Sequence, residues 1–352
     1  MFITGLGTAV PEKRYAQAEC WEAFSESVLS RQLAPRSRAI VRKVLTGNNG
    51  IQTRHLALEN LRDAFDLTPN ALQERFAKHA PRLAAEAARK ALAQAGARAS
   101  RIDALLVSTC TGYLCPGLTS YVGEQLGLRG SILSLDLVGQ GCGAALPNLR
   151  AAEALLSSGQ YETVLSVCVE VCSAALYFDD DPGVLISACI FGDGAGAAVL
   201  SNSPGGKHAI QWRSSSSLMN PGVRDLLRFR HQDGMLRNIL SPLVPELAAR
   251  HVEEVFQDVS RRGHTRRERI QGWVLHPGGR DVLLAITDRM ELKKGDTRWS
   301  EAVLRDYGNL SSPSVYFVLE SAFNDSPSSG EWWMSSFGAG FSCHGALLQV
   351  DI

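Results

Sequence analysis

Cys142 is the strongest candidate nucleophile in the sequence. Glycines flank it at positions 141 and 143, and it lies where an apolar segment turns into an Ala- and Leu-rich helix. Glycines permit a sharp turn and the close approach of a substrate, and the positive end of a helix dipole stabilises a thiolate. The same context also fits a cysteine buried at a tight turn. The functional interpretation therefore requires a base and an oxyanion-stabilising group elsewhere in the chain.

Two further residues could complete such a site. His276 ends an apolar segment and precedes Pro277-Gly278-Gly279, an open turn that can direct a histidine into a cavity. Asn309 precedes an apolar helix, and its amide can donate a hydrogen bond to a developing oxyanion. Alone, the Gly-Asn pair at 308–309 is typical of a turn, and a single histidine is more often structural. Together with Cys142, the two residues fit nucleophilic catalysis on a carbonyl group.

The elements that must position these residues alternate between strands and helices. Residues 83–97 are Ala-rich and predict a helix, and residues 245–259 place apolar side chains on one helical face. Short apolar runs bounded by turn residues predict strands. The predicted strands cover residues 103–108, 131–138, 163–171, 195–200 and 272–275, followed by a helix over 315–323 and a strand–turn–strand over 332–345. This alternation predicts a layered α/β fold.

The best candidate for a joint between two halves is the segment Ser203-Pro204-Gly205-Gly206-Lys207. A similar order of elements lies on both sides of it, which suggests an internal duplication without a residue-level repeat. At roughly 150 residues per domain, a chain of 352 residues agrees with two units. We expect an N-terminal half over residues 1–203 that carries the cysteine. The C-terminal half over 204–352 then carries the histidine and the asparagine.

Composition excludes several classes of function. Lys plus Arg and Asp plus Glu both number 36, and this balance argues against nucleic acid as the main partner. No apolar run approaches the ~18 residues of a membrane span, and the N-terminus does not have a signal-peptide pattern, so we expect a cytoplasmic protein. The eight cysteines lie mostly in apolar runs, which predicts core thiols rather than disulfides or a metal site. The basic run over 261–269 is expected to be a solvated loop, with docking of an acidic carrier protein as the alternative.

Short motifs follow one another along nearly the whole chain: Ile3–Pro11, Thr111-Gly112, Pro116-Gly117, Gln140–Cys142, Phe191–Ala195, Trp273–Gly279, Tyr307–Ser312 and Phe337–Phe341. In this order they resemble the motifs of the type III polyketide synthases. This family is the chalcone-synthase-like branch of the thiolase superfamily. Each motif is weak alone, but the ordered set is specific. The resemblance implies a thiolase-like α/β fold in which two duplicated halves form a five-layered αβαβα core.

The resemblance also implies a reaction cycle. The Cys142 thiolate, stabilised as an ion pair with His276, takes an acyl group from a CoA or acyl carrier protein thioester. His276 and Asn309 then bind the thioester carbonyl of malonyl-CoA, so that the enolate formed on loss of carbon dioxide meets hydrogen-bond donors. This enolate attacks the acyl group on Cys142, the cycle repeats, and the poly-β-keto chain cyclises. The family's cycle needs no cofactor or metal, and the resemblance implies a homodimer.

Several residues match family positions around the cavity. Phe191 matches the aromatic gate between the CoA tunnel and the cavity, and Arg54 lies closest to the family pattern for CoA contacts. Gly338 and Ala339 belong to the C-terminal loop that shapes the cavity, with alanine where the family usually has proline. Cys115 matches the position that reaches into the neighbouring subunit's cavity. The remaining cavity positions read Cys110, Thr111, Cys172, Ala175 and Ser311.

The starter group follows less directly from these positions. Plant chalcone synthases carry threonine where Cys110, Cys172 and Ala175 stand, so the cavity is expected to be more apolar or roomier. Such a cavity favours a fatty acyl starter and an alkylresorcinol or alkylpyrone product. The Cys110 and Cys172 pair also resembles bacterial tetrahydroxynaphthalene synthases, which use malonyl-CoA alone, and this alternative stays open.

Three other interpretations fit the sequence less well. A ketoacyl synthase III enzyme shares the Cys, His and Asn set, but its histidine typically lies in His-Gln-Ala-Asn rather than in His276-Pro277-Gly278-Gly279. A thiolase carries a second catalytic cysteine just before its C-terminal glycine-rich turn, whereas Cys343 follows that turn, and we expect it and His344 to be structural. A non-catalytic acyl-binding scaffold would have no need for the complete set of Cys142, His276 and Asn309.

Overall fold

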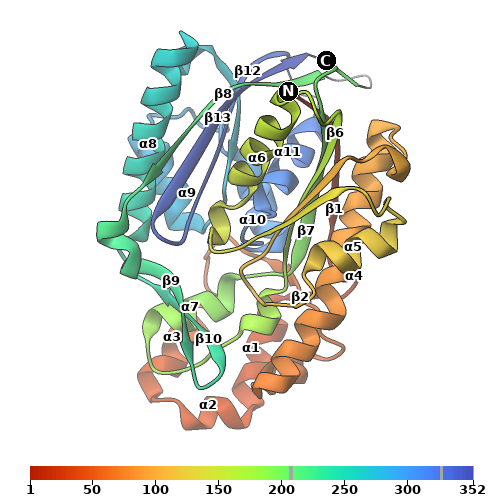
Figure 1. Ribbon diagram of the computed structural model, residues 1–352. Helices are drawn as coiled ribbons and strands as arrows, with labels where there is room; N and C mark the ends of the chain where they lie inside the picture. Colours follow the sequence, from red (N-terminus) through yellow and green to blue (C-terminus); the bar gives the residue numbers. More distant parts are fainter. Residues whose placement is uncertain (206–208, 326–327, 352) are drawn as a thin grey trace.

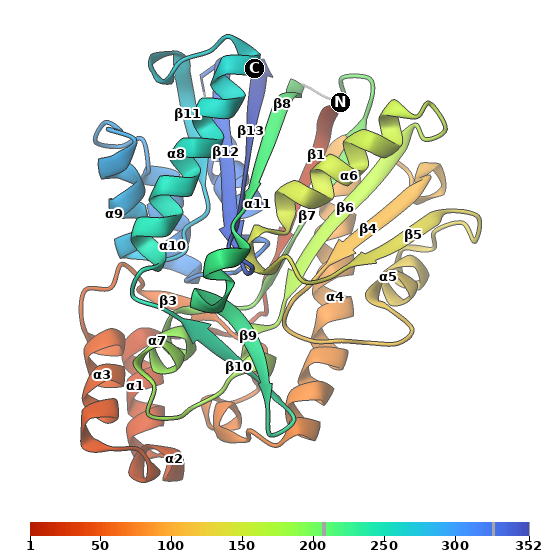
Figure 2. The same ribbon diagram turned by 60° about the vertical axis from the view of Figure 1, so that its left-hand side comes forward.

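The computed structural model describes residues 1–205, 209–325 and 328–351. Its main feature is one continuous sheet with the strand order β11-β12-β13-β8-β1-β7-β6-β4-β5 (Figures 1 and 2). The N-terminal and C-terminal strands meet where β1 (Phe2–Ala9) pairs with β8 (Ala209–Met219) through residues 2 and 3. This short junction joins two half-sheets. The other strands are β4 (Ala104–Ser108), β5 (Leu133–Leu137), β6 (Thr163–Glu170), β7 (Gly194–Ser201), β11 (Ile270–Leu275), β12 (Gly330–Gly338) and β13 (Ser342–Asp351).

Helices form three layers around the two half-sheets. Helices α4 and α5 cover the outer face of the N-terminal half-sheet, and α8, with α9 beside it, covers the outer face of the C-terminal one. Helices α6 and α11 contact strands of both halves and therefore lie between them. The result is the expected five-layered thiolase-like arrangement. The bounds are α4 (Pro69–Ala95), α5 (Leu118–Leu126), α6 (Ala145–Ser157), α8 (Val244–Gly263), α9 (Arg280–Arg289), α10 (Arg298–Tyr307) and α11 (Ser314–Asn324).

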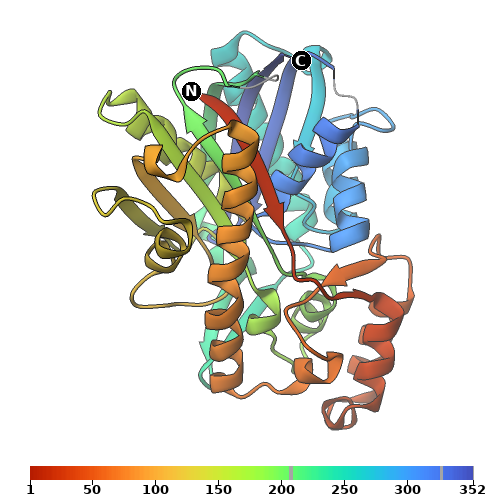
Figure 3. The same cartoon turned by 90° about the vertical axis from the view of Figure 1, so that its right-hand side faces the viewer.

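Strand β1 lies unusually close to helix α4, and small residues on both sides make this possible (Figure 3). A Cβ atom added at Gly5 would lie 2.2 Å from the carbonyl oxygen of Ala91, and one at Gly7 would lie 2.2 Å from that of Ala87. Both alanines are fully buried. The glycines in the N-terminal motif and the Ala-rich helix are therefore two halves of one packing contact.

A smaller lobe lies at one end of the sheet (lower part of Figures 1 and 2). Its elements come from three separate parts of the chain, and they pack on one another: α1 on α3, α3 on α7, and α7 on β10. The lobe consists of β2 (Arg14–Ala16), α1 (Gln17–Glu26), α2 (Val28–Gln32), α3 (Pro35–Thr46), β3 (Thr53–His55), α7 (Pro182–Ile190), β9 (Leu227–Gln232) and β10 (Met235–Leu240).

The predicted strands and helices are all found, although their ends shift. The helix predicted over 83–97 is the second half of α4, which begins after a Thr68 cap and continues through Pro81. The basic run over 261–269 is not simply a solvated loop, because its first three residues complete α8. Arg262 pairs with Asp258 at 2.8 Å, so part of this charge is already neutralised within the chain. Within the described part of the chain, no helix combines the length and apolarity of a membrane span.

Candidate active site

Cys142 lies in a single 3₁₀ turn, Gly141–Gly143, that leads directly into α6. Gly141 has a φ of +53°, a conformation that favours glycine. The C-terminal loop presses on this turn, since a Cβ atom at Gly338 would lie 2.4 Å from the amide nitrogen of Gly143. The cysteine therefore occupies the predicted position at a sharp, tightly packed turn before a helix.

A chain of hydrogen bonds links the three segments that carry the predicted catalytic residues. The Ser311 hydroxyl donates to the Cys142 Sγ at 3.2 Å, and the Ser311 amide donates to the Asn309 Oδ1 at 2.8 Å. The Asn309 Nδ2 donates to the carbonyl oxygen of Gly278 at 3.0 Å. The Gly278 amide in turn donates to the carbonyl oxygen of His276 at 2.9 Å. The loops that carry the cysteine, asparagine and histidine are thus linked through Ser311 and Gly278.

The ring nitrogens of His276 are free to form hydrogen bonds with a substrate. Its side chain is buried and packs edge-on against the Phe337 ring at 5.1 Å between ring centroids. Neither ring nitrogen has a hydrogen-bond partner among the residues that the structure describes. Buried polar atoms are rarely left in this state unless a ligand or water completes them. The histidine therefore fits a role in which it binds a polar group of a substrate.

Burial controls the electrostatics of the cysteine and the histidine. Desolvation raises the pKa of Cys142 to about 12, against which the Ser311 hydrogen bond acts in the lowering direction. Desolvation alone lowers the pKa of His276 to about 3. Each group taken singly is therefore neutral near pH 7. Formation of the predicted thiolate–imidazolium pair needs the attraction between the two opposite charges, which is strong in a low-dielectric interior.

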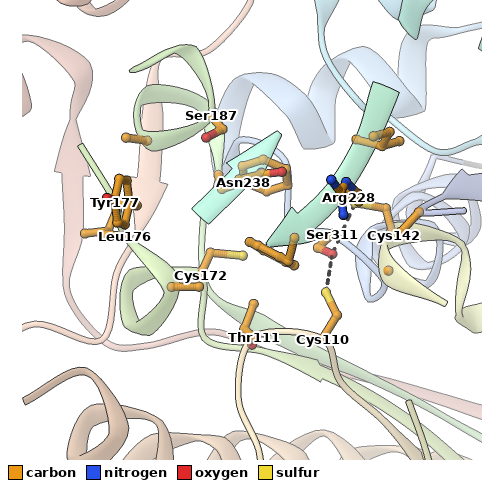
Figure 4. Close-up of a pocket in the computed structure, with 17 residues that line it drawn as sticks. Cys110, Thr111, Cys142, Cys172, Leu176, Tyr177, Ser187, Arg228, Asn238 and Ser311 are labelled. Atoms are coloured by element: carbon orange, nitrogen blue, oxygen red, sulfur yellow. Dashed lines mark hydrogen bonds between the residues drawn. The ribbon is translucent and has the colours of Figure 1, made fainter. Parts of the chain in front are cut away.

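A largely apolar cavity opens in front of Cys142 (Figure 4). Ser311, Cys110 and Cys142 lie together on one wall, and the Cys110 Sγ lies 3.7 Å from the Ser311 Oγ. The small lobe supplies the opposite wall through α7 and the β9–β10 hairpin. Predicted cavity residues that line it are Cys110, Thr111, Cys172, Ala175, Phe191, Ser311 and Ala339. Lining residues that the sequence did not indicate include Leu176, Tyr177, Leu227, Arg228, Phe229 and Asn238.

Comparison with known families decides what this geometry belongs to. Residues 1–204 match the N-terminal domain of the chalcone and stilbene synthases, and residues 214–350 match the C-terminal domain of the same family. The chain belongs to this family of type III polyketide synthases. The family is an acyltransferase family, which confirms the reaction class expected from the motifs.

Bacteria supply several curated relatives of this polyketide synthase. It is 30% identical to a 3,5-dihydroxyphenylacetyl-CoA synthase of Streptomyces toyocaensis, over 99% of this chain and 89% of the relative. It is also 30% identical to a 1,3,6,8-tetrahydroxynaphthalene synthase of Streptomyces peucetius subsp. caesius, over 99% and 92%. An alpha-pyrone synthesis polyketide synthase-like protein of Mycobacterium tuberculosis is 27% identical over 99% and 91%. The crystal structure of PKS-I from the brown alga Ectocarpus siliculosus superposes with a TM-score of 0.90 at 25% identity, over 99% of this chain and 97% of that one.

The synthase holds a buried carboxyl group behind the cavity wall that the sequence did not indicate. Glu170 ends β6, is fully buried, and accepts hydrogen bonds from Ser312 Oγ at 2.6 Å, Thr111 Oγ1 at 2.9 Å and the Cys110 amide at 3.0 Å. The Cys110 thiol and the Ser311 hydroxyl lie at 3.3 and 3.5 Å from its Oε1. Desolvation raises the pKa of Glu170. A single glutamate in an apolar strand motif gives no sequence signal for this role.

Three predicted substrate-binding residues lie outside the cavity lining. Arg54 is buried, and its guanidinium donates to Gln17 and to backbone carbonyls, so its placement does not support a CoA contact at a tunnel mouth. Cys115 is exposed on the loop before α5 and begins the cis Cys115–Pro116 bond. Gly338 lies behind the nucleophile turn, where it permits close backbone packing.

A second apolar pocket of the synthase adjoins the cavity. The two share four wall residues: Cys172, Leu176, Ala188 and Phe191. Helices α1 and α3 and the segment 61–65 enclose the far side, where the lining includes Phe24, Val41, Leu45, Leu61, Ala64 and Phe65. The sequence placed none of these helices near the site. Among the described residues, no cluster of three or more His, Cys, Asp or Glu side chains is placed to hold a metal ion.

Proposed function

We propose that this type III polyketide synthase loads a fatty acyl starter onto Cys142, extends it with malonyl-CoA, and cyclises the product to an alkylresorcinol or alkylpyrone. The observation that carries this proposal is the second apolar pocket behind Cys172 and Phe191. In this proposal a chain attached at Cys142 passes these wall residues and occupies the pocket in the small lobe. The donor of the starter is a CoA thioester or an acyl carrier protein.

The first half-reaction transfers the starter. The Cys142 thiol passes its proton to His276, and the thiolate attacks the thioester carbonyl of the starter. The carbon–sulfur bond to the carrier then breaks, and the carrier thiolate takes up the proton from His276 as it leaves. The Ser311 hydroxyl, 3.2 Å from the Cys142 sulfur, supports the thiolate form by hydrogen bonding.

The second half-reaction extends the chain. The Asn309 side-chain amide and an unpaired ring nitrogen of His276 hydrogen-bond the thioester carbonyl of malonyl-CoA. The carbon–carbon bond to the carboxylate then breaks, carbon dioxide leaves, and the electron pair forms an enolate whose oxygen faces these donors. The enolate carbon attacks the acyl group on Cys142, and the Cys142 thiolate leaves. The extended chain can then return to Cys142 for another cycle.

Apolar burial supports the fatty starter. Each methylene removed from water contributes roughly 0.8 kcal/mol, so a pocket lined by Phe24, Val41 and Leu45 rewards a long chain. Cys172 and Ala175 in the first cavity carry no hydroxyl group, so the acyl chain does not bury an unpaired hydroxyl at these two positions. The relative whose name includes alpha-pyrone synthesis agrees with a pyrone as the product. The tetrahydroxynaphthalene synthase relative favours the second candidate, an enzyme that uses malonyl-CoA alone.

Product analysis tests the starter. Purified synthase is incubated with malonyl-CoA and a series from acetyl-CoA to palmitoyl-CoA, and the products are identified by mass spectrometry. We expect the longer starters to be preferred. Ala64→Trp, which fills the second pocket without touching the first cavity, should shift the preference to short starters. Products formed from malonyl-CoA alone, together with an unchanged preference in Ala64→Trp, would overturn the fatty starter.

We also propose that two copies form a homodimer through the face that carries β5. This strand is the last in the sheet and has one unpaired edge. Apolar side chains near it are exposed to an unusual degree: Tyr113 at 71%, Val138 at 64% and Leu135 at 38%. Exposed apolar groups and an open strand edge are typical of surfaces that bind another chain. Light scattering should give about twice the chain mass of 38.1 kDa, and a monomeric mass would contradict the proposal.

A further inference from the structure

Arg54 is a buried cation that pairs with backbone carbonyls instead of a carboxylate. It lies in β3 and is 4% exposed. Its Nε donates to Gln17 Oε1 at 3.0 Å, and its Nη1 donates to the carbonyl oxygens of Ala188 and Phe191, each at 2.9 Å. Among the described residues, no acidic side chain forms an ion pair with it. A buried charge without a counter-ion is retained only where its hydrogen bonds are well satisfied.

The two backbone acceptors of these hydrogen bonds lie at the C-terminal end of α7. The last carbonyls of a helix lack partners within the helix and carry the negative end of its dipole. Gln17 completes this arrangement, because its Nε2 donates to the carbonyl oxygen of Cys189 at 3.0 Å. The chain leaves the helix at Phe191 in an extended conformation. Arg54 and Gln17 thus fix the backbone at the end of α7, where Phe191 places its aromatic ring in the cavity wall.

The same segment is bound to the backbone of Asn309. Phe191 and Asn309 form a parallel β-bridge. In it the backbone N–H of Asn309 donates to the carbonyl oxygen of Ile190, and the backbone N–H of Gly192 donates to the carbonyl oxygen of Asn309, both at 2.9 Å. Gly308 has a φ of +72°, and a Cβ atom there would lie 2.6 Å from the Ile190 oxygen and 3.0 Å from Arg54 Cγ. The stem of Arg54 therefore packs directly against the turn that presents Asn309.

We propose that Arg54 is a positioning residue that holds the Phe191 ring and the Asn309 amide in fixed relation to each other. It acts through these two residues: it does not line the cavity in front of Cys142, although it borders the second pocket. Because the clamp acts on Asn309 and Phe191, its loss should impair malonyl-CoA decarboxylation and starter selection. Loading of Cys142 with a short starter, acetyl-CoA, depends on the cysteine and His276 and should be largely spared. The inference rests on the roles proposed above for Cys142 and Asn309.

The test compares the two half-reactions in variants of the full-length enzyme. Arg54→Met keeps the stem but removes every donor, and Arg54→Lys keeps the charge but cannot reach all three acceptors at once. We expect decarboxylation of labelled malonyl-CoA to fall by about ten-fold or more in Arg54→Met, because small misplacements of a catalytic group are costly. Acetyl loading, followed by intact mass, should change by less than about three-fold, and Arg54→Lys should recover part of the decarboxylation rate.

Arg75→Met is the matched control. Arg75 also donates to two backbone carbonyls, those of Ser173 and Asp63, but it does not contact the segment 188–191. It should lower the thermal midpoint without changing the ratio of decarboxylation to loading. An unchanged ratio in Arg54→Met, or an equal change in Arg75→Met, would overturn the proposal.

Two further variants keep the test decisive. If Arg54→Met does not fold, Gln17→Leu removes the second half of the clamp and should shift the same ratio in the same direction. Asn309→Ala distinguishes the role of Asn309 itself from the role of Arg54. If it leaves decarboxylation intact, the proposed role of Asn309 fails whatever the Arg54 variants show.

Discussion

The Ser311 hydroxyl lies between the nucleophile and a buried carboxyl group. It donates to Cys142 Sγ at 3.2 Å and lies 3.5 Å from Glu170 Oε1, and it also contacts the Cys110 thiol. Ser311 has a φ of +59°, so its backbone occupies a conformation that is uncommon for residues other than glycine. The position of this hydroxyl is therefore set by the loop that also carries Asn309.

Removal of the Ser311 hydroxyl should make Cys142 less acidic. The hydrogen bond lowers the pKa of Cys142 against the effect of burial, so Ser311→Ala should raise that pKa. The pH at which iodoacetamide inactivates the enzyme at half its maximal rate should then move upward. Ser187→Ala, which removes another cavity hydroxyl without touching Cys142, should leave this pH unchanged. A downward shift in Ser311→Ala would contradict the assignment.

Loss of either predicted enolate donor should suppress decarboxylation. His276→Ala and Asn309→Ala should each slow carbon dioxide release from labelled malonyl-CoA by about 10²–10³-fold, the usual cost of one oxyanion donor. Normal release in either variant would refute that residue's role.

The same assay has a pH signature in a Cys142→Ala background. No thiolate is then present to stabilise an imidazolium, and burial lowers the pKa of His276 to about 3. The imidazole therefore remains neutral as pH falls from neutrality towards that value. Decarboxylation by Cys142→Ala should accordingly be insensitive to pH over the mildly acidic range, and a titration near pH 6.5 would contradict the buried, neutral imidazole.

Glu170→Gln should destabilise the protein in a pH-dependent way. The amide nitrogen would face hydroxyl donors such as Ser312 and Thr111, and each unsatisfied buried group costs about 1–3 kcal/mol. Burial raises the pKa of Glu170, so its ionisation opposes folding as pH rises from the unfolded value of 4.5 through the raised folded value. Glutamine does not titrate. Denaturant unfolding should therefore show that the free energy of unfolding of the wild type exceeds that of Glu170→Gln by more at pH 4.5 than at about pH 8.

Ala175→Trp should discriminate between the two adjoining pockets. Ala175 lines the first cavity but not the second pocket, so tryptophan there should hinder growth of the chain near Cys142. We expect long starters to lose more activity than short ones, while acetyl loading on Cys142 is retained. Equal loss for all starter lengths would indicate general disruption, and no change would place the acyl chain elsewhere.

The sequence predicts the elements of the central layers well because their signals are local. The apolar runs of β4, β6 and β7 and the Ala-rich part of α4 carry their periodicity and turn residues within the segment itself. The positions of Cys142, His276 and Asn309 follow from motifs with glycine or proline beside them. These residues lie at element ends, where the chain must turn sharply.

The lobe that covers the cavity has no such signals. Helices α1 to α3 are short, and β9 and β10 pair only with each other and alternate irregularly between buried and exposed residues. Arg54 shows the consequence for single residues. An arginine in a polar segment predicts an exposed cation. Only the folded structure shows that Arg54 is hydrogen-bonded to carbonyl groups at the end of α7.

The place of β1 within the sheet has a consequence for synthesis of the chain. Its partner strand β8 follows about 200 residues later, which is roughly 10–40 s of translation at about 5–20 residues per second. During this interval α4 is the first element available to cover β1, through the contacts that Gly5 and Gly7 permit. Bulkier residues at these two positions should therefore lower the yield of soluble enzyme from expressing cells, even at temperatures where the finished fold is stable.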